Sequence, residues 1–501
     1  MADEAMALPS GAKPVGYAWM VREFELCVMP NHRWSFVGRV ARQTAVEQGL
    51  VWETFPLAYG PDDLAGHIEF ALRYDGINLE ILSALFKHLG QAAIDPLQTW
   101  IRAKPTGAYR RKAWFLYELL TGRRLDLPDL AQGNYEPLLD PAAYFTGDSR
   151  RSRRHRVVDN LLGTSGFSPM VRRTPTIEHF TARKLDRRLA TILEGHDAET
   201  LLRAATWLYT KETRSSFQIE HEKPSTEKMS RFVAALQQAG SLRAITRDAL
   251  VALQNALVDP RFRDGGWRDT QNYVAGDARV KVDFVSPRPE DLPDLMDGWL
   301  TCIAQLEGAD VDAVVAAAAA SFGFVFLHPF EDGNGRIHRF LIHYLLVRKG
   351  FTPPGTIIPV SATMLARMAE YDACLERFSV PLMARVQYEV DGQGHVDVLN
   401  ETASLYRYFD ATPMVEALYG WLAQAINQDF VHEIEFMILY REVRRRLPEV
   451  VDLPERLADQ LVARCLENEG RLSNSRRKSM FPMLTDDEVA GVEALIRGRH
   501  E

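Results

Sequence analysis

A polar loop of twelve residues between two apolar stretches constrains this chain more than any other feature. Residues 328–339 have the sequence HPFEDGNGRIHR. The run before it, Ala313–Leu327, is apolar apart from one serine, and the run after it, Phe340–Val347, is also mostly apolar. This pattern predicts two buried helices joined by a tight loop. A glycine-rich loop that leads into a helix presents backbone N–H groups and the positive end of a dipole, which suits a phosphate.

The residue types in the loop fit that chemistry. Gly333 and Gly335 allow positive φ and let a polyphosphate approach the backbone. Asp332 offers a hard oxygen ligand for Mg²⁺. Arg336 and Arg339 are three residues apart, so they share one helix face and can bind phosphate oxygens.

Two further residues complete the loop, and plainer roles compete with the catalytic ones. His328 can take a proton from a hydroxyl near neutral pH, and Phe330 is expected to anchor the loop in the core. A histidine before proline is often a structural residue, however, and Asp-Gly-Asn-Gly is often a simple turn. Calcium is disfavoured, because an EF-hand loop starting at Asp332 would need glycine where Ile337 stands. Neither a P-loop nor a Rossmann fingerprint occurs.

Residues 328–339 resemble the Fic motif, H-P-F-x-[D/E]-G-N-G-R-x-x-R, at every fixed position. The resemblance implies a mainly α fold, with a Fic-type helical core, a short β-hairpin flap, and helical N-terminal and C-terminal domains. It implies a protein adenylyltransferase that moves AMP from ATP, with Mg²⁺, to a Ser, Thr or Tyr hydroxyl of a target protein. The residues so implied are a general base (His328), a Mg²⁺ ligand (Asp332), an anion nest (Gly333, Asn334, Gly335) and two arginines for the β- and γ-phosphates (Arg336, Arg339).

A second motif suggests control of that reaction. Residues 198–222 are expected to form one helix, in which Ser216 and Glu220 stand four apart and share a face. The pair is similar to the Fic family's inhibitory motif, [S/T]-x-x-x-E-[G/N], although His221 replaces the usual Gly or Asn. The resemblance implies that Glu220 pairs with Arg339 and takes the place of the γ-phosphate. In an isolated helix the same two residues would be an ordinary solvated pair.

Two β-hairpins are expected. Residues 273–284 alternate around a Gly276-Asp277 turn and, by the resemblance, form the flap (about 265–287) that would register a target by strand addition. A purely structural hairpin would have the same pattern. Residues 386–398 predict a second hairpin with a structural role. Tyr371, in an expected helix over 367–378, is a candidate to pack on the nucleotide, the target or the core.

The length of 501 residues suggests two to four domains. The expected organisation is an N-terminal domain of unknown role (1–150), a linker with a basic segment (151–195), the Fic core (196–400) and a helical C-terminal domain (401–501). The core would hold the inhibitory helix (about 198–222), the flap and the catalytic loop (328–339). The C-terminal segment resembles that of long bacterial Fic proteins. A plain helical cap is favoured for this segment over a winged-helix unit.

Composition limits the other classes. The content of 46% hydrophobic and 25% charged residues is that of a globular protein, and the net charge of −8 gives no general attraction to nucleic acid. The N-terminus has no apolar signal core, and no run reaches the ~20 apolar residues of a membrane span. A cytoplasmic protein is therefore expected. The four cysteines are scattered, which favours reduced core thiols over a zinc site.

Alternative functions remain open at this point. The same site could remove AMP, with Glu220 orienting water, or transfer a phosphoryl group as in the Doc branch. A non-catalytic module that binds nucleic acid is a third alternative, supported by Arg150–Arg156 and Arg476–Lys478. A solvated linker or a helix start is favoured for the first of these basic runs. The sequence does not name the target protein or the relief of inhibition, and it leaves room for a homo-oligomer.

Overall fold

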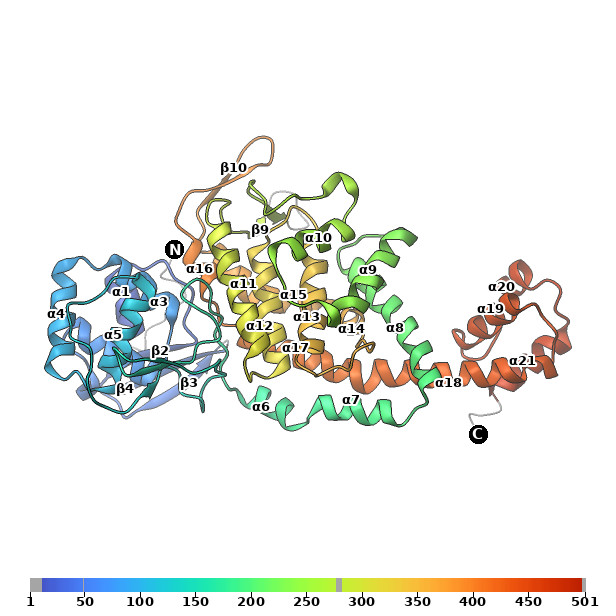
Figure 1. Ribbon diagram of the computed structural model, residues 1–501, viewed down its shortest axis with the longest axis horizontal. Helices are drawn as coiled ribbons and strands as arrows, with labels where there is room; N and C mark the ends of the chain where they lie inside the picture. The colour runs from blue at the N-terminus through green and yellow to red at the C-terminus, as the bar shows by residue number, and fades with distance from the viewer. Residues whose placement is uncertain (1–10, 48, 276–281, 498–501) are drawn as a thin grey trace. The chain divides into compact units, whose positions relative to one another are not determined.

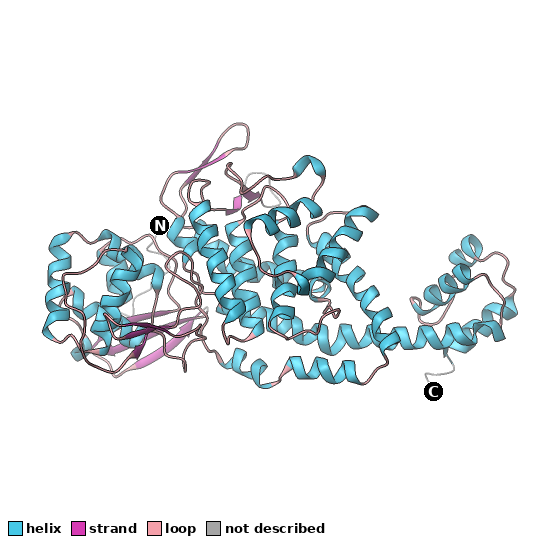
Figure 2. Cartoon of the chain, viewed as in Figure 1, coloured by secondary structure: helices cyan, strands magenta, loops and turns pink. Residues whose placement is uncertain are grey.

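A computed structural model describes residues 11–47, 49–275 and 282–497. The chain divides into two compact units. The first comprises Met1–His179, Gln238–Phe351 and Met368–Tyr419, and the second Phe180–Gln237, Thr352–Arg367 and Gly420–Glu501. Helices dominate both units (Figure 2), which confirms the mainly α fold class.

The first part of the first unit contains a four-stranded sheet that the expected helical N-terminal domain omits. The sheet has the order β1-β2-β4-β3, in which β2 pairs parallel to β4 and the other pairs are antiparallel. Its strands are β1 (Lys13–Val15), β2 (Arg33–Gly38), β3 (Gln43–Glu47) and β4 (Leu50–Pro56). Strand β2 is almost wholly buried, and its sequence, RWSFVG, alternates polar and apolar residues over only its first four positions.

Helices cover this sheet, and one of them is interrupted. Figure 1 shows α1, α3 and α5 grouped with strands β2 and β4, and their apolar side chains share one core. The apolar spacing of residues 65–89 is typical of a helix, but the helix is broken at Gly76, which has φ +88°, and restarts where Asn78 accepts the Ile81 N–H at 2.9 Å. The helical segments are α1 (Tyr17–Glu23), α2 (Leu64–Phe70), a π-helical stretch (Ala71–Asp75), α3 (Leu79–His88), α4 (Gln91–Ala103) and α5 (Ala108–Thr121).

The basic run at 150–156 is a hairpin, which differs from the linker or helix start favoured for it. Strands β6 (Arg150–Ser152) and β7 (Val157–Asp159) are antiparallel, and β5 (Glu136–Pro137) pairs with β7. Arg154 turns inward and donates to Glu118 Oε1 at 2.9 Å and to Asp129 Oδ1 at 2.6 Å. Internal carboxylates thus already take up part of the charge of this run.

The part of the first unit that contains residues 328–339 consists mainly of helices. Helix α12 begins at Ala313 and ends at Leu327, as predicted, and lies between α11 and α13 (Figure 1). Asp312 caps it by accepting the Val314 and Val315 N–H groups at 2.9 and 3.1 Å. The other helices here are α10 (Arg247–Leu257), α11 (Leu292–Gly308), α13 (Asn334–Arg348), α15 (Met368–Met383), α16 (Ala403–Arg407) and α17 (Thr412–Gln424), which runs into the second unit, as does α6 (Pro175–Ala182).

Both predicted hairpins have their strands in the expected places. β8 (Tyr273–Ala275) pairs antiparallel with β9 (Val282–Val285), and β10 (Tyr388–Val390) pairs antiparallel with β11 (Val396–Val398). The Gly276-Asp277 turn lies outside the described residues. The apolar pattern of residues 405–428 predicts one helix, but α16 ends at Arg407, and Asp410 accepts the Thr412 N–H at 3.0 Å at the start of α17.

All the secondary structure described in the second unit is helical. Its helices are α7 (Leu185–Glu194), α8 (Ala198–Ile219), α9 (Thr226–Gln238, whose last residue belongs to the first unit), α14 (Val360–Ala366), a π-helical stretch (Ala425–Phe430), α18 (Val431–Arg446), α19 (Glu455–Leu466), α20 (Asn474–Met480) and α21 (Asp486–Arg497). Glu212 on α8 accepts the Ser361 N–H at 2.8 Å and so caps α14. Lys211 pairs with Glu433 on α18 at 2.6 Å. A separate apolar cluster joins the end of α18 to α19, α20 and α21.

Two other expectations concern membranes and thiols. Among the described residues, every helix is too short or too polar to cross a bilayer. Cys302, Cys374 and Cys465 are buried free thiols, whereas Cys27 is exposed and therefore is not the core thiol expected.

Candidate active site

His328 lies at the end of α12, where its backbone conformation and its contacts orient the imidazole ring. It caps the helix with φ +48°, and its N–H donates to Phe324 O at 3.0 Å. Its Nδ1 lies 3.1 Å from the Val325 carbonyl oxygen. A carbonyl oxygen can only accept, so Nδ1 carries the proton and Nε2 is the nitrogen with the lone pair. Nε2 is thus the atom that can act as a base.

The segment that leads into the first hairpin holds the backbone of the catalytic loop. Arg268 is 5% exposed; its Nε donates to His328 O and its backbone N–H to Pro329 O, both at 2.9 Å. Asn272, one residue before β8, donates to Phe330 O at 3.0 Å. Arg268 also donates to the carbonyls of Thr270 and Pro287, which fixes the hairpin base to the same loop.

Helix α10 contributes a second set of contacts. Gln254, fully buried, and Asp264 bond reciprocally: Gln254 Nε2 donates to Asp264 Oδ2 at 2.9 Å, and the Asp264 N–H donates to Gln254 Oε1 at 3.1 Å. Asp264 Oδ2 also accepts the Glu331 N–H at 3.2 Å, and Gln254 Nε2 reaches Asp332 O at 3.3 Å. Burial, and then the nearby carboxylates of Glu331 and Asp332, raise the pKa of Asp264.

Gly333, Asp332 and Arg336 form the turn into α13. Gly333 is the residue before the helix and has φ +94°, and a Cβ there would lie 3.1 Å from Val258. Asp332 Oδ1 accepts the Gly333 N–H at 2.6 Å and the Arg336 Nη2–H at 2.5 Å. Arg336 therefore lies beside the proposed metal ligand, and each of these charges offsets the other.

The other predicted motif residues lie in or beside α13. Asn334 bonds back to Phe330, accepting its N–H at 3.0 Å and donating to its carbonyl at 2.7 Å, so its side chain staples the loop. Gly335 lies inside α13, and the positive φ expected for it is wrong, since only Gly333 of the pair has one. Arg339 is fully buried on α13, one helical turn beyond Arg336. Phe330 is buried against Trp267, as expected of an anchor.

The remaining predicted residues belong to α8, the position after it, and α15. Ser216 is buried on α8 of the second unit, and Glu220 follows the last residue of that helix, with its N–H donating to Phe217 O at 3.1 Å. Tyr371 is 4% exposed, and its ring lies 6.3 Å from that of His338, which favours the core among its alternatives. Burial lowers the pKa of His338 to about 3, so this motif histidine is neutral.

Sequence reasoning missed Gln254, Asp264, Arg268 and Asn272. They precede the motif by 56 to 74 positions and act on backbone atoms, so no local pattern links them to it. The one available signal was position: Gly265-Gly266-Trp267-Arg268 comes directly before the predicted hairpin.

Comparison with known proteins places this geometry in a recognised domain. Residues 244–346 match the Fic/DOC family model, so the chain contains a Fic domain there. It is similar to protein adenylyltransferase fic-1 of Caenorhabditis elegans, at 38% identity over 111 residues, which are 22% of this chain and 19% of that protein. It is similar to protein adenylyltransferase Fic of Nematostella vectensis at 35% over 112 residues, 22% of this chain and 25% of that protein. The chain thus spans about a fifth to a quarter of the length of these curated relatives.

Solved structures resemble the chain more loosely. A Fic family protein from Desulfovibrio desulfuricans aligns with a TM-score of 0.40 at 19% identity, covering 62% of this chain and 89% of that one. Fic-1 residues 134–508 from C. elegans align with a TM-score of 0.33 at 16% identity, covering 71% of this chain and 98% of that one.

Proposed function

We propose that this protein transfers AMP from ATP to a Ser, Thr or Tyr hydroxyl of a target protein. The observation that carries the proposal is the tautomer of His328: the Val325 carbonyl fixes the proton on Nδ1 and leaves Nε2 to accept the proton of an attacking hydroxyl. The match of residues 244–346 to the Fic/DOC family, and relatives named protein adenylyltransferases, support it.

The loop supplies positioning and charge in this proposal. Gly333 and Gly335 allow the polyphosphate to approach backbone N–H groups at the start of α13, while Asn334 keeps the loop in shape. Arg336 and Arg339 bind the β- and γ-phosphates. Attack on the α-phosphorus then depends on alignment and neutralised charge more than on covalent help from the protein.

Asp332 is the proposed Mg²⁺ ligand, and its surroundings fit that role. The described residues hold no cluster of three or more metal-binding side chains. Mg²⁺ in nucleotide sites is commonly held by one or two carboxylates together with phosphates and water, so a single carboxylate suffices. The Asp332 side chain is 45% exposed and paired with Arg336, which is the arrangement expected where a cation and a phosphate meet. The ion, when bound, neutralises phosphate charge.

We further propose that Glu220 restrains the reaction. Its support is the Ser216–Glu220 spacing and its place directly after the last residue of α8, where a short backbone change can move the carboxylate. A carboxylate beside Arg339 would compete with the γ-phosphate for that guanidinium.

The experiment compares ATP labelled at the α-phosphate with ATP labelled at the γ-phosphate, using the full chain and a cell lysate. Glu220→Gly should place α-label on protein, and His328→Ala in that background should abolish it. Gln218→Gly, on the same helix, controls for added backbone flexibility, and His395→Ala, at an exposed histidine, controls for loss of an imidazole. Label from γ alone would establish phosphoryl transfer instead. If Glu220→Gly instead lost the ability to release AMP from protein that already carries it, the reaction would be removal of AMP, with Glu220 as the base.

A further inference from the structure

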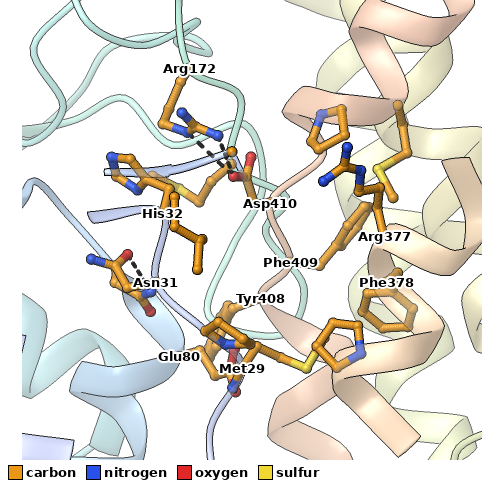
Figure 3. Close-up of a pocket in the computed structure, with 18 of the residues that line it drawn as sticks. Met29, Asn31, His32, Glu80, Arg172, Arg377, Phe378, Tyr408, Phe409 and Asp410 are labelled. Carbon is orange, nitrogen blue, oxygen red and sulfur yellow. Dashed lines mark hydrogen bonds and ion pairs between the residues drawn. The ribbon is translucent and has the colours of Figure 1, made fainter. Parts of the chain in front are cut away.

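A cavity of about 430 Å³ lies within the first unit, separate from the catalytic loop (Figure 3). It is enclosed by residues 29–32, the start of α3, the C-terminal half of α15 and residues 408–414, all in the first unit. None of the described residues that line it belongs to 328–339. Its volume equals about fourteen waters at ~30 Å³ each and falls within the roughly 300–1,000 Å³ of small-molecule sites.

One wall of the cavity is apolar and adaptable. Phe378 and Phe409 supply aromatic surface, and Met29, Met170 and Met414 supply flexible thioethers. Methionine side chains adjust to ligands of irregular shape, and aromatic rings bury much area at small entropic cost. This wall suits the apolar or aromatic body of a small molecule.

The charged groups gather at another part of the cavity. Arg172 donates to Asp410 Oδ2 through Nη2 at 2.8 Å and Nε at 3.3 Å, while Asp410 Oδ1 accepts the Thr412 N–H. The carboxylate is therefore satisfied internally. Arg377 extends from α15 toward the cavity (Figure 3) and forms no ion pair with any residue in the described part of the chain. Its neighbour Glu376 also lines the cavity, and both side chains are exposed.

Two buried polar groups of the lining, His32 and Glu80, are uncharged near neutral pH. Burial, and then the Arg172 charge, lower the pKa of His32 to about 4. Glu80 is 3% exposed, and its Oε1 accepts the Met29 N–H at 2.7 Å. Burial raises the pKa of Glu80 to about 8, so the group is mostly protonated at pH 7. Of the two guanidiniums that line the cavity, Arg172 is paired with Asp410, whereas Arg377 extends into the cavity (Figure 3) and has no ion pair among the described residues.

We propose that this cavity binds a compact amphipathic anion, with its apolar body on the Phe378–Phe409–methionine wall and its carboxylate or phosphate on Arg377 beside Arg172. A cationic ligand fits less well, because the Asp410 carboxylate is already bonded on both oxygens and two guanidiniums face the same space. A guanidinium, by contrast, binds a carboxylate or phosphate through two parallel hydrogen bonds.

The cavity is also packed against the helix that carries the proposed base. Phe378 stacks on Phe326 at a centroid distance of 4.1 Å, and Phe409 meets the same ring edge-on at 5.6 Å. Phe326 lies two residues before His328 at the end of α12. A ligand in the cavity would therefore contact Phe378 and Phe409, whose rings contact the end of α12. Such an indirect contact with the proposed base suits an effector more than a substrate.

The test uses 8-anilinonaphthalene-1-sulfonate, a fluorescent aromatic anion, with the full chain. Saturable binding of one dye per chain is expected. Val380 lines the cavity and is 62% exposed, so Val380→Trp can block the opening without overfilling the core and should abolish binding. Arg377→Gln should raise the Kd at least about tenfold. Val46→Trp and Arg39→Gln, at exposed positions outside the cavity, are the matched controls and should bind as the unaltered chain does.

Displacement of the dye identifies the charged group. Phenyl phosphate and 3-phenylpropanoate should displace it, and displacement by only one of them would assign the acid as phosphate or carboxylate. The amine 2-phenylethylamine, of similar size, should not displace it. Val380→Trp and Arg377→Gln are each checked for folding by circular dichroism. If both bound the dye as tightly as the unaltered chain does, the proposal would be overturned. Displacement by the amine as efficient as by the acids would also overturn it.

Discussion

Of the residues outside 328–339, Arg268 is the one whose loss should disturb the candidate active site most specifically. Its guanidinium donates to the carbonyl oxygens of His328, Thr270 and Pro287 at 2.9, 2.7 and 2.6 Å. Arg268→Met keeps the apolar stem and the length of the side chain but removes all three donors. The carbonyls of His328 and Pro287 would be left wholly or partly buried without this partner, whereas that of Thr270, an exposed residue, can bond to water.

The magnitude follows from two opposing terms. At ~2 kcal/mol for each of the two carbonyls away from water that lose their donor, the substitution costs about 4 kcal/mol. Burial of the cation has its own cost, visible in the pKa of Arg268, which burial lowers from 12.5 to about 10. That shift is worth about 3 kcal/mol at ~1.36 kcal/mol per pKa unit, and Arg268→Met relieves it. The net loss is therefore about 1 kcal/mol, concentrated where Arg268 meets the catalytic loop.

Amide hydrogen exchange measured by mass spectrometry reads this loss locally. The Phe330 and Glu331 amides are bonded to Asn334 and Asp264, and a loss of ~1 kcal/mol should speed their exchange about fivefold. Arg261→Met is the control, since that arginine is 78% exposed and, within the described part of the chain, its ion pair is with nearby Asp259. If these two amides exchanged no faster in Arg268→Met than in Arg261→Met, Arg268 would not be what holds the backbone of the catalytic loop.

Three further substitutions test other parts of the first unit. Burial raises the pKa of Asp75 to about 7, so unfolding free energy should fall by up to ~1.4 kcal/mol per pH unit between pH ~4 and ~7, and Asp75→Asn should remove that slope in urea titrations at pH 5 and 7. Gly333→Ala, at φ +94° with Val258 in the way, should lower unfolding free energy by about 1–2 kcal/mol and reduce AMP transfer. Glu118→Gln should cost about 3 kcal/mol in the same titrations, since it leaves the guanidinium of Arg154, 12% exposed, without its main partner.

The parts of the fold that the sequence predicted are those specified by neighbouring residues. Helix α12 begins and ends where its apolar run does, and Asp312 at its start and the left-handed residue at its end are local signals. The strands of both hairpins lie within the segments whose alternation predicted them. The motif likewise specified its own geometry, apart from Gly335, because the positive φ that the turn requires is met by Gly333 alone.

The parts that it did not predict depend on residues far apart in the chain. Strand β2 is defined by parallel pairing with β4, across the excursion of β3, and its polar–apolar alternation extends over only four residues. The break at Gly76 was missed because the apolar spacing continues on both sides of it. Asp264 and Arg268 act on the motif from more than 59 residues away, so only the folded chain connects them to it.

The loop from His328 to Gly333 is largely buried, and a buried loop must pair its backbone groups somewhere. The segment that pairs them runs from Asp264 to Asn272 and continues directly into β8 at Tyr273. The hairpin base and the catalytic loop are therefore one hydrogen-bonded body, with Phe284 of β9 lying 6.3 Å from the His328 ring. If the hairpin registers a target by strand addition, as proposed from the resemblance, the place where a target binds and the base that activates its hydroxyl are held at a fixed separation by these contacts. Alignment of the two would then be built into the fold before any substrate arrives, which lowers the entropic part of the barrier.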